Sequence, residues 1–260
     1  MAKTPIDDVI AKLDAIIAES YSTPSRAGYF AALYRRVTAA VRDNIGKGYF
    51  DDDIRMEKLD VAFAGRYLDA YAQWKAGDHK LSHSWNVAFD AVANPYALIL
   101  HHLVLGINAH INYDLGIAAA EVAPSPIELE AMKNDFDKIN TLLGGVVPSL
   151  LSELEVISPW IRVLERFGKR FELQLASFLV NIARDFAWML AKELAVLENN
   201  PELQKLLLAK KDNEIADLGN QIANPNILVK MFNLIIWMRE SHDVKKNIEV
   251  LGAGQDFQMT

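Results

Sequence analysis

His110 and Asp114 are the residues whose types and spacing are best suited to chemistry. They lie four residues apart within His101–Glu121, an apolar stretch with the length of a long helix. At about 100° per residue, this spacing places both side chains on one helical face. A carboxylate one turn away orients an imidazole and raises its basicity, which suits a general base, a metal ligand or a structural hydrogen-bonded pair. The sequence leaves these three roles open.

A second polar face lies on the same stretch. His101, Asn108 and Asn112 fall within about 40° of one another and roughly opposite His110. Polar groups on both sides of an apolar helix cannot all face water, so some of them are buried and need hydrogen-bond partners. We therefore predict that residues 95–120 form a central buried helix that lines the functional site.

A divalent metal is one ligand that this site is predicted to hold. His110, Asp114 and Asp137 offer nitrogen and oxygen ligands for zinc, manganese or iron. Further residues are assigned to a polar pocket or a structural network: Asp60, Arg66, Asn108, Asn112, Asn140, Arg184, Asp185 and Trp188. The pair His79 and His83 is expected to lie on an exposed loop, and the roles of His101 and His102 stay open.

Composition excludes several classes of function. The net charge of −7 disfavours nucleic acid as a partner, and the absence of cysteine excludes disulfides, thiol nucleophiles and Cys-ligated metals. No apolar secretory segment opens the chain, and its apolar runs are too short to span a bilayer. Neither a Gly-x-Ser-x-Gly motif nor a phosphate-binding glycine loop occurs. These features predict a cytoplasmic protein without a membrane span.

Helix signals recur along the whole chain. A small polar residue precedes proline at Thr4-Pro5, Thr23-Pro24, Asn94-Pro95, Ser125-Pro126, Ser158-Pro159 and Asn224-Pro225, a pattern typical of helix starts. No segment alternates with the period of a strand. We predict an all-α, bundle-like single domain, residues 1–240, with about eight to ten helices around the helix 95–120. One helix is predicted to end at Gly144-Gly145, and residues 241–260 are expected to form a loosely attached tail.

The segment Asn108-Ala109-His110-Ile111-Asn112-Tyr113-Asp114-Leu115 resembles a marker of an uncharacterised, mostly bacterial family of all-helical proteins. The segments 59–69, 135–140 and 183–188 are also similar to that family, so the resemblance covers about residues 25–195. No activity is established for the family. The resemblance therefore implies an all-helical fold and the location of a site, without a mechanism.

Three hypotheses of function follow. The first is a polar pocket centred on His110 and Asp114 that serves a metal-assisted hydrolase, with these two residues catalytic, or a small-molecule-binding protein. The second is a non-catalytic helical scaffold or partner-binding protein, in which the same residues form a hydrogen-bond network. The third is a carrier of apolar ligands, favoured by the Leu- and Ile-rich helices. Substrate, reaction type and oligomeric state are not determined by the sequence.

Overall fold

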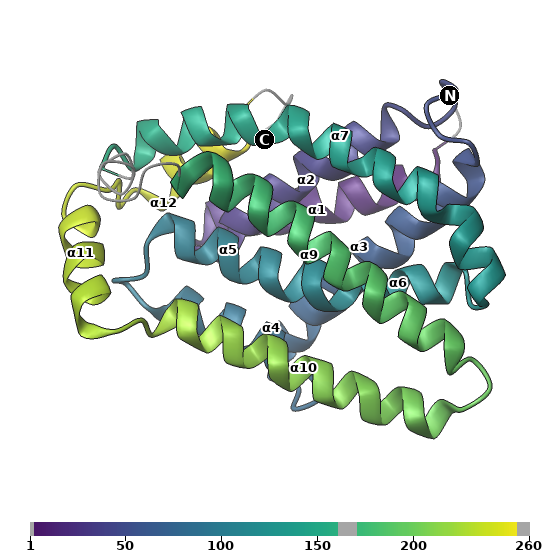
Figure 1. The fold of residues 1–260 in the computed structure, drawn as a ribbon. Helices are drawn as coiled ribbons and strands as arrows, with labels where there is room; N and C mark the ends of the chain where they lie inside the picture. The colour runs from purple at the N-terminus through teal and green to yellow at the C-terminus, as the bar shows by residue number, and fades with distance from the viewer. Residues whose placement is uncertain (1–2, 161–170, 254–260) are drawn as a thin grey trace.

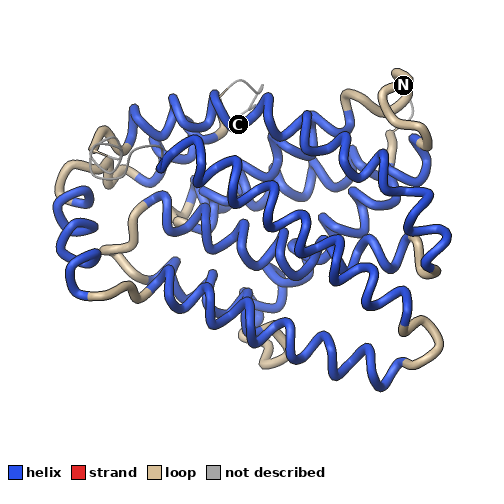
Figure 2. Tube along the Cα trace, in the orientation of Figure 1, coloured by secondary structure: helices blue, strands red, loops and turns tan. Residues whose placement is uncertain are grey.

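The computed structural model describes residues 3–160 and 171–253, and these residues form helices and no strand (Figures 1 and 2). The predicted all-α class is confirmed. The α-helices are α1 (Pro5–Ser22), α2 (Ala27–Arg42), α3 (Asp53–Ala76), α4 (His83–Asp90), α5 (Ile99–Ala109), α6 (Leu115–Val122), α7 (Pro126–Ile157), α9 (Phe171–Val196), α10 (Pro201–Ala223), α11 (Ile227–Trp237) and α12 (Val244–Leu251). None of the described helices is long and apolar enough to cross a membrane.

Side-chain caps explain where several helices begin. Thr4 caps α1, Ser125 caps α7, and in both cases an acidic residue three positions later completes a capping box. The predicted starts at Pro5 and Pro126 follow from these caps. At Asn94-Pro95 the helix begins only at Ile99, because residues 94–98 form turns that lead into α5. The central helix is therefore shorter at its N-terminus than predicted.

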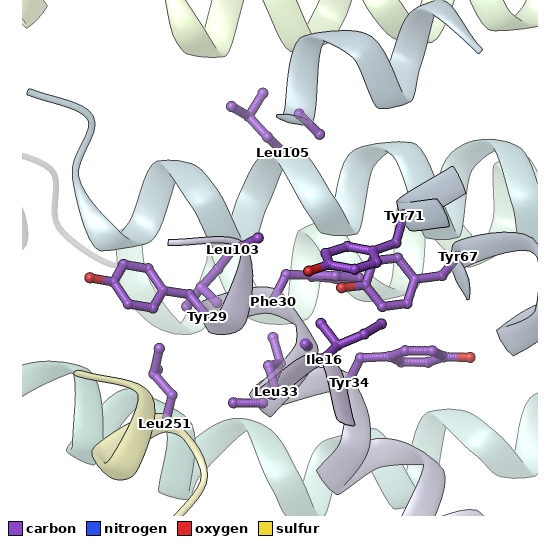
Figure 3. Packing of buried hydrophobic residues seen from close by; sticks show 14 of the residues in the cluster. Ile16, Tyr29, Phe30, Leu33, Tyr34, Tyr67, Tyr71, Leu103, Leu105 and Leu251 are labelled. Atoms are coloured by element: carbon purple, nitrogen blue, oxygen red, sulfur yellow. The ribbon is translucent and has the colours of Figure 1, made fainter. Parts of the chain in front are cut away.

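The central helix consists of α5, one π-helical turn (His110–Asp114) and α6. Helices α2, α4 and α10 pack against α5, while α3 and α9 pack against α6. Figure 3 shows the interior beside α5, where the rings of Phe30 and Tyr34 meet Tyr67. The π turn carries two buried polar residues of the central helix, His110 and Asp114. Single π turns in α-helices are frequent at functional sites.

Helix α7 is continuous across residues 144–145, where the sequence predicts a helix end. It continues through Gly144 and Gly145, and Pro148 lies inside it. The apolar face that includes Leu143 continues beyond the glycines in Leu154 and Ile157, which are almost completely buried. Tertiary burial of this face outweighs the poor helix propensity of the glycine pair.

The C-terminal segment also differs from the expected loose tail. Residues 244–251 form α12, which packs against α1, α2 and α7. Asn247, Ile248 and Leu251 have at most 1% of their surface exposed, and the Leu251 carbonyl accepts a hydrogen bond from Arg36. The prediction was wrong for residues 244–251 because this segment is mostly polar, and the apolar face of its amphipathic helix is narrow. Residues 254–260 of the predicted tail lie outside the described residues.

Candidate functional site

Three donors converge on the carboxylate of Asp114. The Arg66 Nε donates to Oδ1 at 3.2 Å, and the Trp85 Nε1 donates to Oδ2 at 2.9 Å. The His110 Nδ1 lies 3.0 Å from the same Oδ2. The Asp114 side chain is only 3% exposed, so its partners must compensate for the water it has lost. Arg66 also pairs with Glu121 at the surface.

This arrangement decides which nitrogen of His110 carries the proton. A carboxylate oxygen can only accept, so Nδ1 carries the hydrogen and Nε2 keeps a free lone pair. The Nε2 atom is buried and has no hydrogen-bond partner. Burial lowers the pKa of His110, an effect that Asp114 partly offsets, so the ring is neutral at neutral pH. His110 therefore presents an unused acceptor.

Aromatic rings hold the imidazole in place. The Phe63 ring stacks on it with centroids 3.7 Å apart and an interplanar angle of 6°. The edge of the Tyr34 ring approaches from another side at 4.4 Å. With Asp114 fixing Nδ1, these contacts leave the ring little freedom, so the direction of the Nε2 lone pair is set by the fold.

His110 lines a cavity between α2, α3, the central helix, α7 and α9. The space open to the centre of a water-sized sphere is about 100 Å³, enough for more than a single water molecule. Most lining side chains are apolar, among them Leu33, Val37, Leu59, Ile107, Ile139 and Leu143. Ile107 and Ile111 are only half-buried because they border this space. Phe30, Leu33 and Tyr34 form part of the α2 wall (Figure 3).

Two further side chains of the cavity lining carry a buried polar atom without a hydrogen-bond partner. These atoms are the Asp60 Oδ2 and the Tyr34 hydroxyl oxygen. Burial raises the pKa of Asp60 to about 8, with a smaller contribution from Glu57, so this carboxyl is protonated at neutral pH. Burial, and then the nearby Asp60, raises the pKa of Tyr34. Both groups are therefore neutral and can each donate a hydrogen bond.

Arg184 is the fourth polar side chain of the cavity lining. It is 4% exposed, its guanidinium lies over the Phe136 ring at 4.2 Å, and one NH2 group donates to the Phe136 carbonyl at 2.5 Å. Trp188 lies one helical turn from Arg184 on α9, but the ring that the guanidinium meets is that of Phe136. Trp188 packs against the same Phe136 ring, with centroids 4.8 Å apart.

The second polar face of the central helix has a structural role in the described contacts. Asn112 donates to the Asn108 side chain at 2.9 Å, and Asn108 donates to the Ile215 carbonyl at 2.9 Å. These bonds tie α5 to α10 on the side away from His110. The amides therefore belong to a network between helices rather than to the cavity.

The acidic residues expected to reach in from neighbouring helices point elsewhere. Asp137 is exposed and pairs with Lys133, and Asp185 is exposed as well. Asn140 is half-buried, with its side-chain oxygen unpartnered. Among the side chains that the structure describes, no three His, Cys, Asp or Glu residues are grouped so that they could hold a metal ion. The metal set His110, Asp114 and Asp137 stays a prediction.

Three site residues were not identified from the sequence as part of the pocket: Tyr34, Phe63 and Trp85. All three read as ordinary core residues of predicted helices. For Trp85 a signal existed, because a buried indole N–H needs an acceptor. Its partner Asp114 is distant in the sequence, so only the fold reveals the pair.

Buried carboxylates from distant segments fix the helices that carry the site. Asp135 accepts hydrogen bonds from the amides of Asp51 (2.7 Å) and Asp52 (2.9 Å), just before α3. Asp212 accepts from the amides of His83 (2.7 Å) and Ser84 (2.9 Å), and Glu240 accepts from that of Ile99 (3.0 Å). Anions are favoured at helix N-termini, where the amides have no partner within the helix. Helices α3, α4 and α5, which bring Arg66, Trp85 and His110 together, are each held at the N-terminus in this way.

Comparison with known proteins gives the family. A model for a family of unknown function, DUF5995, matches residues 6–225. The chain belongs to this family. No curated protein and no solved structure matches it. The matched range of this DUF5995 protein includes the Asp114 network and all four polar side chains of the cavity, so the site lies within the part shared with the family.

Proposed function

We propose that this DUF5995 protein binds a small molecule with a mostly apolar body in the cavity beside His110. A hydrogen-bond donor of the ligand, such as a hydroxyl, meets the Nε2 of His110. The observation that carries the proposal is this Nε2 lone pair, which is buried and has no partner, on a side chain that lines the cavity. Ligand sites typically combine apolar walls with a few fixed polar groups in this manner.

Energetics support an occupant that donates to His110. A buried acceptor left unsatisfied costs about 1–3 kcal/mol, which a ligand donor recovers on binding. The ring is already oriented by Asp114 and Phe63, so binding costs little additional ordering of the protein. Asp60 and Tyr34 supply donors for acceptor atoms of the same ligand.

Filling the cavity tests the proposal directly. Ile139 borders the cavity, whereas Ile127 on the same helix α7 is 83% exposed. Ile139→Trp is expected to abolish the fluorescence gain of N-phenyl-1-naphthylamine, an apolar probe, while the control Ile127→Trp leaves it unchanged. Circular dichroism checks that both variants fold, because overpacking costs about 1–3 kcal/mol. Binding in this cavity is contradicted if the wild type gives no fluorescence gain, or if Ile139→Trp gives the same gain as the wild type. Either result favours the structural-network hypothesis.

A second pair of measurements tests the donor. Calorimetry compares decanol with its methyl ether, which has no hydrogen to donate. The wild type is expected to prefer decanol by about tenfold, equivalent to roughly 1.4 kcal/mol. His110→Asn removes the preference, because an asparagine amide can still donate to Asp114 from near the Nδ1 position and offers nothing at Nε2. Equal binding of both compounds by the wild type counts against His110 as the acceptor.

General-base catalysis is a second candidate, favoured by the His110–Asp114 geometry. The Nδ1 atom is held 3.0 Å from a carboxylate, and Nε2 is free to take a proton from a bound hydroxyl or water. Hydrolysis of p-nitrophenyl decanoate that disappears in His110→Asn supports this candidate. Metal-assisted hydrolysis gains no support from the described residues. Its test is a titration of metal-stripped protein with zinc, manganese and ferrous iron.

A further inference from the structure

Arg184 places a buried positive charge at the edge of the cavity. It is 4% exposed, and its Nε atom has no hydrogen-bond partner. Among the described residues, no carboxylate forms an ion pair with it. Its contacts with the Phe136 ring and the Phe136 carbonyl involve neutral groups. No described carboxylate therefore contacts the charge directly.

A buried cation without a partner is costly and rare. Burial of an ion is usually offset by an opposite charge with good geometry. Burial lowers the pKa of Arg184 to about 10, so the guanidinium still carries its charge at neutral pH. Asp137 and Asp185 favour the charged form electrostatically, but neither forms a described ion pair with Arg184, and both side chains are exposed to solvent. An anion in the cavity would supply the missing partner.

We propose that the ligand of this cavity is an amphipathic hydroxy acid, whose carboxylate pairs with Arg184 and whose hydroxyl meets His110 across an apolar chain. This inference rests on the proposed function, from which it takes the position of the cavity and the role of His110. It adds the chemical class of the ligand. The planar guanidinium matches a carboxylate through two parallel hydrogen bonds.

The rest of the lining favours a carboxylate over a more highly charged head group. Arg184 is the one cation among the described lining residues, and most of the wall is apolar. A phosphate would bring nearly two charges and three acceptor oxygens, which a single guanidinium cannot satisfy. Asp60 does not repel a monoanion, because its carboxyl is protonated at neutral pH.

Matched ligands separate this inference from the proposed function. Calorimetry compares a series of ω-hydroxy acids, from hexane- to dodecane-based chains, with the α,ω-diols of equal length. Both members of each pair carry the hydroxyl for His110, and only the acid carries a charge. At the chain length that fits, the wild type is expected to bind the acid at least about tenfold more tightly than the diol.

Charge variants provide the controls. Arg184→Gln is expected to bring acid and diol to equal affinity, and Arg184→Lys to retain part of the preference through its charge. Lys192→Gln removes one positive charge from an exposed position of the same helix α9 and leaves the preference unchanged. If Arg184→Gln does not fold, the relative affinities of the wild type and of Arg184→Lys for acid and diol still test the inference.

Each outcome is informative. Binding of diols and acids with equal affinity at every length overturns the hydroxy-acid inference and leaves the proposed function standing. A preference for the acid that survives in Arg184→Gln also overturns it, because the charge then acts elsewhere. Binding of neither compound removes the proposed function and this inference together.

Discussion

Removing the carboxylate of Asp114 should destabilise the protein in graded steps. Asp114→Ala leaves two buried donors, the Trp85 Nε1 and the His110 Nδ1, without an acceptor. At about 1–3 kcal/mol for each unsatisfied group, the cost is roughly 2–6 kcal/mol. Alanine itself favours the helix, so no loss of helix propensity adds to the cost.

Asp114→Asn should cost less, for a geometric reason. The single amide oxygen can replace Oδ2 and keep the bonds from Trp85 and His110. The amide NH2 then faces the Arg66 Nε, but the Arg66 side chain is 29% exposed and can turn to water. The expected loss is about 1–2 kcal/mol, which corresponds to one charge-assisted hydrogen bond at a partly exposed donor.

Urea unfolding followed by far-ultraviolet circular dichroism measures both losses, provided that the slope m stays constant across the variants. Asp137→Ala is the matched control, because the Asp137 side chain is 48% exposed and pairs with Lys133 at the surface. A surface pair of this kind contributes about 0–1 kcal/mol. If Asp114→Ala costs no more than Asp137→Ala, the convergence of donors on Asp114 is not a source of stability and the reasoning is refuted.

Three further changes test other parts of the structure. Burial raises the pKa of Asp60 from 3.8 to about 8, so the stability contributed by its neutral form is lost as pH rises between these values. Asp60→Asn does not titrate, and its urea midpoint relative to that of the wild type should therefore increase from about pH 5 to about pH 8. Because burial lowers the pKa of His102 from 6.5 to about 3, stability is lost as pH falls through that window, and His102→Phe should show a shallower acid decline in melting temperature. Gly116→Ala would place a Cβ 2.6 Å from the Ala187 carbonyl oxygen and should cost about 1–3 kcal/mol by urea unfolding. Gly65→Ala, where the Cβ meets nothing within 4 Å, is its control and should gain about 0.5–1 kcal/mol; equal effects would refute the close packing of α6 on α9.

Local signals in the sequence determined the helical fold. The capped prolines set the starts of α1 and α7, because a cap and its amide partners lie within three residues of one another. The spacing of His110 and Asp114 likewise placed their side chains in contact, since the two residues are one helical turn apart. Such interactions are encoded by neighbours in the chain, and they can be read without knowing the rest of the structure.

Only the tertiary structure decided what surrounds that pair. The partners Arg66 and Trp85 come from α3 and α4, and their position depends on how these helices pack against the central one. The packing of α7 also decides which of two nearby acids is buried. Asp135 faces the interior, whereas Asp137, two residues later, faces the solvent. The π turn at 110–114 has no recognisable sequence signal. Long-range packing creates the cavity, and it alone brings Arg184 of α9 to the space that His110 borders.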